Sequence, residues 1–331
     1  MKHILGIGNA ITDIPVFLPS GSLLQEFNFL PGSMNHIDGQ VMGKLWKRVQ
    51  GMELQYIAGG SAANTVAALQ RLGAKCRFVG KIGRDAVGEK FVQGHRGDGV
   101  DMLLLEGEQE SGKALTFISG RDGERTFATC LGAALEFTPQ ELKEEMFCGY
   151  DLLHIEGYLL QAAGVVERAM EIAKGMGMNI SIDLGSAGIV MRYREVLHRL
   201  VADFADIVFA NEQEAQAFSG AEGEEALEYI HSVMKQPGSI AVVKLGEEGS
   251  LIKRGDEVFR IGAVSAEVMD TTGAGDAYAA GFLYALSCGA PMEKCGETGS
   301  FVASEVVSAV GPKLPEDSWK AILVWINSKL D

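Results

Sequence analysis

Short apolar segments alternate with longer amphipathic segments from about residue 150 onward. The short segments are typical of buried strands, and the longer ones have the spacing of helices that cover a sheet. Alternation of this kind predicts a doubly wound α/β fold, with a mostly parallel sheet and helices on both of its faces. We expect strands at 150–155, 179–183, 206–210 and 240–245, and helices near 163–175, 192–203, 211–218 and 223–235.

The first half of the chain is less regular, although it also contains clear elements. An apolar run at 2–8 predicts a first strand, and SAANTVAALQRL (61–72) predicts a helix that Gly73 ends. Further strands are expected at 76–80, 101–106 and 113–119, with a hairpin turn at 120–127 that has Asp-Gly at its tip and a late hairpin at 250–261. Two or three helices finish the chain.

Prolines 15, 19 and 31 interrupt the segment 12–56, so no long helix is expected there. With 331 residues, the chain has the length of one large domain. We expect a single domain over 1–331, in which parts of about 12–40 and 100–130 form a small β appendage and the remainder forms the α/β core.

The composition excludes several classes of partner. The formal net charge is −15 and no run is rich in Lys and Arg, so a nucleic-acid partner is not expected. No stretch approaches the roughly 18 apolar residues of a membrane span, and the N-terminus lacks the apolar core of a signal peptide. The five cysteines lack CxxC spacing, which favours buried thiols in a reducing cytoplasm.

The segment DTTGAGD, from Asp270 to Asp276, carries the most specific chemical signal. A strongly helical run follows it and ends at Gly289, so the segment is a loop that enters a helix. Its small residues leave backbone N–H groups bare at the positive end of that helix, which favours a bound anion. Beside a bound phosphate, the Asp276 carboxylate can accept a proton from an attacking hydroxyl. The alternative is a glycine-rich turn in which Asp276 only starts the helix.

Two further motifs complete a recognisable order. AGGSAANT spans 58–65, and NEQE spans 211–214 directly after a predicted strand. Together with DTTGAGD, they resemble the signatures of the PfkB/ribokinase-like family of carbohydrate kinases. Segments such as GNAITDI and GGSAANT are most similar to the adenosine-kinase-type members. The resemblance implies a ribokinase-like fold and a single kinase domain, in which the small β appendage acts as a lid.

The resemblance also implies an ATP-dependent phosphotransferase with Asp276 as the catalytic base. Backbone N–H groups would form an anion hole that stabilises the transferred phosphoryl group; its residues would be Gly273, Ala274 and Gly275. Asn211 would contact ATP, and Glu214 would hold Mg²⁺ through bound water, since Mg²⁺ prefers oxygen ligands and keeps its waters.

The same resemblance assigns the rest of the nucleotide site. LGEEG (245–249) is similar to the family stretch that flanks the nucleotide, which places Gly246 and Gly249 beside ATP. Lys244 stands where Thr is common in the family, so the usual side-chain contact to ATP differs here. Arg125 would reach the phosphates when the lid closes. The segment 308–315 resembles the one that closes over adenine and holds a monovalent cation, which makes K⁺ a candidate beside Mg²⁺.

The acceptor is expected to be the 5′-hydroxyl of a nucleoside. In members similar to this chain, five matching positions bind the acceptor; they are Asn9, Asp13, Gly59, Gly60 and Asn64. The Asp13 carboxylate would bond two neighbouring ribose hydroxyls. Apolar side chains would cover the base; the candidates, each of which could equally be ordinary core, are Met34, Phe117, Phe127, Tyr158 and Leu159.

Other functions remain as alternatives. A sugar kinase for ribose, fructose or 2-keto-3-deoxygluconate would differ only in its acceptor. A non-catalytic nucleoside or sugar sensor would have no need of Asp276. An NAD dehydrogenase is disfavoured, because Ile11 stands at the third glycine position of the run that begins at Gly6, and no helix is expected after it. Both a monomer and a homodimer fit the resemblance.

Overall fold

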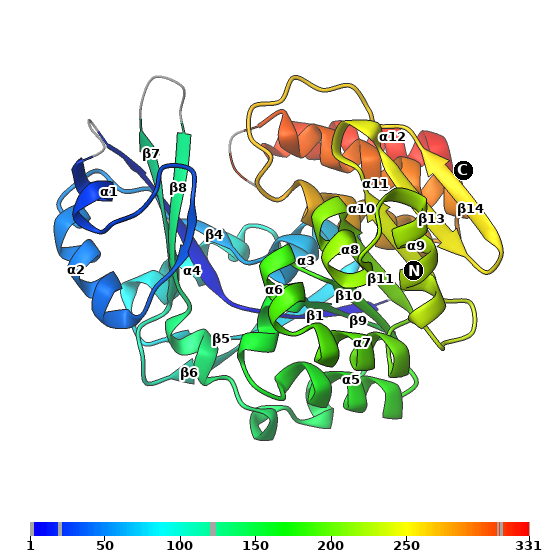
Figure 1. The fold of residues 1–331 in the computed structure, drawn as a ribbon, viewed down its shortest axis with the longest axis horizontal. Coiled ribbons are helices and arrows are strands. Elements are labelled where there is room, and N and C mark those ends of the chain that lie inside the picture. Colours follow the sequence, from blue (N-terminus) through cyan, green and yellow to red (C-terminus); the bar gives the residue numbers. More distant parts are fainter. Residues whose placement is uncertain (1–2, 19–21, 120–123, 310, 312–313, 331) are drawn as a thin grey trace.

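A computed structural model describes residues 3–18, 22–119, 124–309, 311 and 314–330. These residues form a large sheet in the main body and a small sheet beside it (Figure 1). The nine strands of the large sheet run in the order β14-β13-β12-β11-β10-β9-β1-β5-β6. Their bounds are β1 (His3–Ile7), β5 (Lys75–Gly83), β6 (Asp101–Gly107), β9 (Leu152–Glu156), β10 (Asn179–Asp183), β11 (Ile207–Asn211), β12 (Ile240–Lys244), β13 (Ser250–Arg254) and β14 (Glu257–Ile261).

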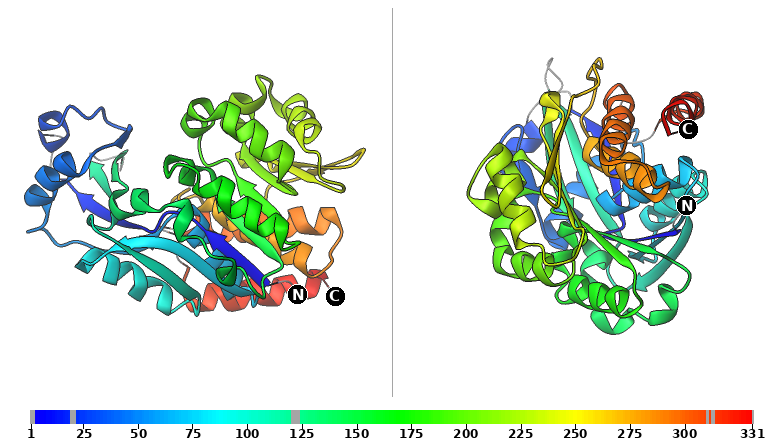
Figure 2. Two further views of the ribbon diagram at one scale, coloured as in Figure 1. Left: turned by 90° about the horizontal axis from the view of Figure 1, so that it is seen from below. Right: turned by 90° about the vertical axis from the view of Figure 1, so that its right-hand side faces the viewer.

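The large sheet is parallel from β12 to β6, and the late hairpin β13–β14 adds two antiparallel strands. Helices cover both of its faces, as Figure 2 shows. One face packs against α3 (Ser61–Arg71), α10 (Ala274–Ser287), α11 (Met292–Val307) and α12 (Glu316–Leu330). The other packs against α5 (Val165–Gly175), α6 (Ala187–Arg192), α7 (Arg194–Asp203), α8 (Glu212–Ser219) and α9 (Gly223–Val233). The prediction of a doubly wound, mostly parallel α/β fold is confirmed.

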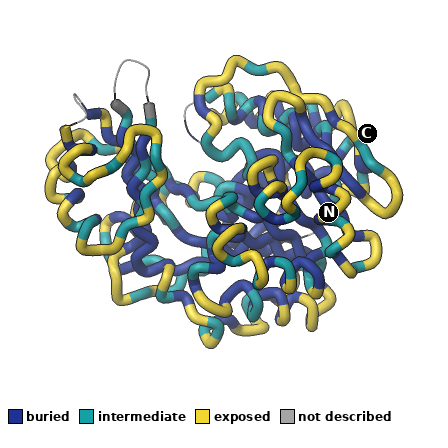
Figure 3. The backbone as a smooth tube through the Cα atoms, in the orientation of Figure 1, coloured by how far each residue is buried: buried dark blue, intermediate teal, exposed yellow. Residues whose placement is uncertain are grey.

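Burial on both faces explains why the central strands are apolar without alternation. In β1, Ile4 contacts one helical layer, whereas Leu5 and Ile7 contact the other. Figure 3 shows the consequence, a buried sheet with exposed residues on the outer sides of the helices. Within the described residues, no helix combines the length and apolar character that a membrane crossing requires.

The small sheet has the strand order β3-β8-β7-β2-β4. Its strands are β2 (Ile11–Phe17), β3 (Met34–His36), β4 (Ile57–Gly59), β7 (Gly112–Ser119) and β8 (Glu124–Cys130). Ile14, Val16 and Phe117 point to one face, where α1 (Ser22–Glu26) and α2 (Gly39–Val49) cover them. Successive strand residues point to opposite faces, so Asp13 lies on the other face, which these helices leave open.

The chain crosses between the small sheet and the main body four times within the described residues. The crossing segments are short, and they comprise residues 8–10, 60, 108–111 and 131. Between the first two crossings lie β2, β3, α2 and β4, and between the last two lie β7 and β8. The two sheets are therefore interleaved in sequence, although each has its own core.

Several predicted elements need correction. The range 100–130 for the appendage begins too early, because β6 pairs with β5 in the large sheet. The helix expected at 192–203 is present as α7, and a further helix that was not expected, α6, precedes it. Pro15 lies within β2, and an 11-residue helix, α2, occurs in the segment where no long helix was expected. The hairpin β7–β8 is present, while the tip of its turn, 120–123, lies outside the described residues.

Candidate active site

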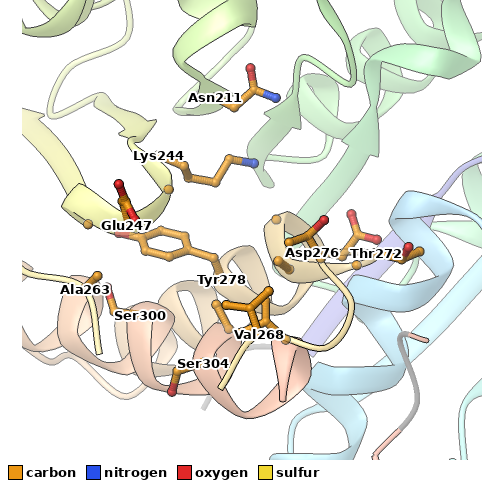
Figure 4. A pocket seen from close by; sticks show the side chains of 18 of the residues that line it. Asn211, Lys244, Glu247, Ala263, Val268, Thr272, Asp276, Tyr278, Ser300 and Ser304 are labelled. Carbon is orange, nitrogen blue, oxygen red and sulfur yellow. The ribbon is translucent and has the colours of Figure 1, made fainter. Parts of the chain in front are cut away.

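A cavity of about 1160 Å³ opens where the carboxyl ends of β10, β11 and β12 meet the start of α10 (Figure 4). Parallel strands bring their carboxyl ends to one edge of a sheet, which is where ligands bind in α/β folds. The edge supplies Asp183, Asn211 and Lys244, and the loop into α10 supplies residues 271–276. The NxxE and DTTGAGD motifs, far apart in sequence, thus line the same cavity.

The DTTGAGD loop is shaped by its first and fourth residues. The Asp270 carboxylate accepts hydrogen bonds from the backbone N–H of Thr272 at 3.0 Å and of Gly311 at 2.8 Å. Gly273 adopts a left-handed φ of 79° and begins the 14-residue helix α10. The loop and this first turn line the cavity at the end of the helix that favours negative charge, and within the turn Ala274 N–H donates to the Thr271 carbonyl at 3.2 Å.

Two residues of α3 hold the side chain of Asp276. Its carboxylate accepts hydrogen bonds from Ser61 Oγ at 2.7 Å and Asn64 Nδ2 at 2.9 Å, both on α3. Burial raises the pKa of Asp276 to about 7, and these two hydrogen bonds oppose the shift only in part. A carboxylate with that pKa can accept a proton near neutral pH.

Lys244, at the end of β12, also contacts the DTTGAGD loop, where its Nζ lies against Gly275. Its ammonium donates to Asp183 Oδ2 at 2.7 Å. Burial alone would lower the pKa of Lys244, but the carboxylates of Asp183 and Glu214 outweigh burial and raise it. The ammonium is therefore a stable positive charge at the floor of the cavity.

Asn211 and Glu214 form a capping box at the start of α8. Asn211 Oδ1 accepts from the Glu214 backbone N–H at 2.9 Å, and the Glu214 carboxylate accepts from Asn211 N–H at 2.9 Å and Nδ2 at 2.6 Å. Glu214 is only 2% exposed, and burial with nearby Asp183 raises its pKa to about 7. Among the described residues, no three acidic, His or Cys side chains form a cluster that could hold a metal ion.

The residues predicted to bind the acceptor lie together where the small sheet joins the main body. Asn9 follows β1, Asp13 is on β2, and Gly59 ends β4. Asp13 Oδ2 lies against Gly59, where an added Cβ would be only 2.2 Å away. Gly60 has a φ of 92°, and a Cβ there would meet the Asn9 carbonyl at 2.3 Å. Gly60 is therefore required by its left-handed φ and by the close approach of the Asn9 backbone, whereas Gly59 leaves room for the Asp13 carboxylate.

Glu156, at the carboxyl end of β9, is a site residue that the sequence reasoning missed. It is 1% exposed, and it accepts hydrogen bonds from Asn9 N–H at 3.0 Å, Asn9 Nδ2 at 2.9 Å and Ala62 N–H at 2.7 Å. Burial raises its pKa to about 7. Glu156 thus connects β1 to the start of α3. The sequence signal for Glu156 was an acidic residue directly after a predicted strand. Asp183 has the same kind of position, at the end of the predicted strand 179–183.

Arg125 extends from β8 of the small sheet to the DTTGAGD loop. Its guanidinium lies 2.5 Å from Asp270 Oδ1 and 3.4 Å from Thr272 Oγ1. Burial of Asp270 would raise its pKa, but Arg125 and the backbone donors hold that pKa at about 2. The predicted contact between Arg125 and phosphate remains a prediction, and the structure places the side chain against the DTTGAGD loop.

The candidate side chains for covering a base divide into three groups. Met34 and Phe127 are register partners on the open face of the small sheet. Tyr158 lines the cavity. Phe117 and Leu159 are fully buried, the first beneath α2 and the second in the core of the main body. Of the five candidates, Phe117 and Leu159 are therefore ordinary core residues, which is the alternative that the sequence left open.

The remaining nucleotide-side predictions lie around the cavity. Gly246 and Gly249 line it, and Gly249 has a φ of 94° that brings its Cα close to the Ile261 carbonyl. The loop after β14 and α11 complete the wall with residues that the sequence reasoning did not name, among them Ala263, Ser300 and Ser304 (Figure 4). Val264 lines the cavity beside them. Within 308–315, residues 310, 312 and 313 lie outside the described residues.

Comparisons with known proteins identify the family of the chain. Residues 33–319 match the pfkB family of carbohydrate kinases. The crystal structure of adenosine kinase from Sinorhizobium meliloti is 35% identical with a TM-score of 0.85, over 97% of this chain and 98% of that one. A probable sugar kinase from Rhizobium etli is 32% identical with a TM-score of 0.86, over 98% and 99%.

A 5-dehydro-2-deoxygluconokinase from Halalkalibacterium halodurans is 32% identical over 273 residues, which cover 78% of this chain and 81% of the relative. Similarity thus extends both to a nucleoside kinase and to sugar kinases. On the family match and the shared fold, the chain belongs to the pfkB family of carbohydrate kinases and is a phosphotransferase.

Proposed function

We propose that the protein transfers the γ-phosphoryl group of ATP to the 5′-hydroxyl of a nucleoside. The observation that carries this proposal is the position of Asp276, between the anion-binding turn of α10 and the residues Ser61 and Asn64 of α3. The nucleotide cavity lies on one side of this carboxylate. The strip formed by Asn9, Asp13 and Gly59 lies at the junction with the small sheet.

The reaction is a direct exchange of one O–P bond for another. The acceptor oxygen forms a bond to the γ-phosphorus, while the bond from that phosphorus to the β–γ bridging oxygen breaks and leaves ADP. The proton of the acceptor hydroxyl passes to the Asp276 carboxylate. The N–H groups at the start of α10 stabilise negative charge on the transferred group.

Glu214 and Asn211 would hold Mg²⁺ through its bound water. When bound with ATP, Mg²⁺ would neutralise phosphate charge. The residues of the chain then position the nucleotide: the glycines at 246 and 249 permit close approach, and Val264 and Ala263 provide apolar contact for adenine. K⁺ is a second candidate ion, for the segment 308–315.

The open face of the small sheet favours a nucleoside over a sugar acid. Phe17 and Met34 on this face are 69% and 62% exposed, and Phe127 pairs with Met34 in register. Such side chains suit the flat apolar surface of a base. Among the described residues, Arg125 on β8 is a cation beside this face, and it is paired with Asp270.

An assay of ADP release with Mg-ATP should separate the candidate acceptors. The panel would contain adenosine, inosine, guanosine, cytidine, ribose, fructose and 2-keto-3-deoxygluconate. We expect turnover with at least one nucleoside and much weaker turnover with the free sugars, because only a nucleoside can contact the apolar face. Turnover with a sugar alone would replace the nucleoside by that sugar. Binding of a nucleoside without any turnover would favour the sensor alternative.

Replacement of Glu214 by Gln should raise the Mg²⁺ concentration needed for half-maximal rate by roughly tenfold, because a second-layer carboxylate contributes about this much to metal affinity. Gln keeps the length and one acceptor of the capping box, so the start of α8 should persist. The measurement is a Mg²⁺ titration of the rate at saturating ATP. Glu225→Gln, which changes an exposed carboxylate in the first turn of the next helix, α9, is the matched control and should leave the titration unchanged.

A further inference from the structure

The charges that line the nucleotide cavity are unbalanced. Among the described residues that line it, five are acidic: Asp183, Glu212, Glu214, Glu247 and Asp276. Within that same described set, Lys244 is the lone Lys or Arg side chain. ATP adds several negative charges to this space. A negatively charged ligand in a negatively charged cavity requires local positive charge, and Lys244 is the part of the chain that supplies it.

Lys244 also has a defined position relative to the anion-binding turn. A Cβ built on Gly275 would lie 3.1 Å from Lys244 Nζ, so the ammonium touches the backbone of that turn. The side chain comes from β12, beside the nucleotide residues Asn211 and Gly246, and Figure 4 shows it extending between Asn211 and Asp276. Ser61 and Asn64 hold Asp276 from α3. The turn therefore lies between two elements: α3, which holds the Asp276 carboxylate, and β12, which carries the Lys244 ammonium.

We propose that Lys244 is a catalytic residue that stabilises the ADP leaving group, and that Asp183 is its positioning residue. This proposal rests on phosphoryl transfer from ATP, and it does not depend on which acceptor is used. As the bond between the γ-phosphorus and the bridging oxygen breaks, its electron pair stays on that oxygen. Lys244 remains protonated throughout, and its charge offsets the charge that ADP gains.

Asp183 fixes the ammonium in this place. The two side chains are 14% and 8% exposed, and they are 2.7 Å apart. An exposed lysine would move among many conformations, whereas a buried pair keeps its geometry at the moment of reaction. The Thr that is common at this position in similar sequences would provide a hydrogen bond without a charge.

The test uses Lys244→Met, Lys244→Arg, Asp183→Asn and the double variant Asp183→Asn/Lys244→Met in the full chain. We expect Lys244→Met to lower kcat roughly ten- to a hundredfold, somewhat less than loss of an unshared oxyanion donor, because Mg²⁺ shares the charge. KM for the acceptor should stay within about threefold, since the ammonium is remote from the acceptor. Lys244→Arg should restore most of the rate, and Asp183→Asn should give an intermediate loss.

The double variant guards against misfolding, because Lys244→Met alone leaves the buried Asp183 carboxylate without its cation. We expect the double variant to fold and to show the same loss of kcat. A double variant with near wild-type kcat, or a Lys244→Met effect confined to KM for ATP, would overturn the proposal.

A binding measurement separates this proposal from the choice of acceptor. Isothermal titration with MgADP and with AMP needs no turnover. We expect Lys244→Met to weaken MgADP binding by roughly tenfold and to leave AMP binding unchanged, since AMP lacks the β-phosphate. Equal MgADP affinity in the variant and the wild type refutes the role of Lys244, even if the acceptor is a nucleoside. Failure of every nucleoside in the turnover assay refutes the acceptor alone.

Discussion

Asp276→Asn is expected to lower kcat by about 10²–10⁴-fold, the usual contribution of a positioned general base. Asn has the same shape as Asp and can still accept the hydrogen bond from Ser61, but it cannot take the proton of the acceptor hydroxyl. Nucleotide binding should persist, because the anion-binding N–H groups belong to the backbone of residues 273–275. Steady-state kinetics with the best acceptor, together with nucleotide titration, would measure both effects.

The pH dependence provides an independent check on this role. The pKa of Asp276 is raised to about 7, and a base acts only when it is deprotonated. For the wild type, kcat/KM should therefore fall as the pH decreases below about 7. Asp13, whose pKa burial also raises to about 7, titrates in the same range and bears on acceptor binding. An Asp276→Asn variant that keeps the wild-type rate would remove Asp276 from the mechanism, and Ser61→Ala serves as the milder control.

Glu156→Ala is expected to lower the free energy of unfolding by about 3 kcal/mol or more, because it leaves three buried donors without a partner and each unpaired donor costs about 1–3 kcal/mol. Those donors are the two N–H groups of Asn9 and the backbone N–H of Ala62. Equilibrium unfolding in urea would measure the loss.

Glu156→Gln is the matched control for this prediction. Its carbonyl oxygen can keep the two bonds from Asn9, but its amide N–H₂ would face the N–H of Ala62. We expect an intermediate loss of stability and a higher KM for the acceptor, since Asn9 is then less firmly oriented. A Glu156→Ala variant as stable as the wild type would show that the three donors find other partners.

The sequence predicted best those features that are local or contiguous. The alternation of strands and helices after residue 150 identified the parallel sheet, because each strand there is buried on both faces and therefore reads as an apolar run. DTTGAGD identified the anion-binding turn for a similar reason. The turn, the helix start and Asp276 lie within seven consecutive residues, so their chemistry is visible without any knowledge of distant contacts.

Features that depend on pairing between distant segments were harder to predict. β6 reads like any other strand, and only its partner β5 assigns it to the large sheet. Phe117 and Phe127 are both aromatic strand residues, yet one points to α2 and the other to the open face. Glu156 gains its role from Asn9 and Ala62, which are 147 and 94 residues away. No pattern within one segment reveals such contacts.

The four crossings between the sheets have a consequence for how binding and shape are linked. Any rotation of the small sheet must bend residues 8–10 and Gly60, and Asn9 and Gly60 are also proposed acceptor contacts. Acceptor binding and a change in the angle between the two sheets would therefore both alter the conformation of Asn9 and Gly60. An acceptor that fits one angle better will shift the population toward it. A substitution at these crossings that strengthens acceptor binding will also change the preferred angle between the two sheets. Acceptor affinity and the movement of the small sheet are therefore coupled.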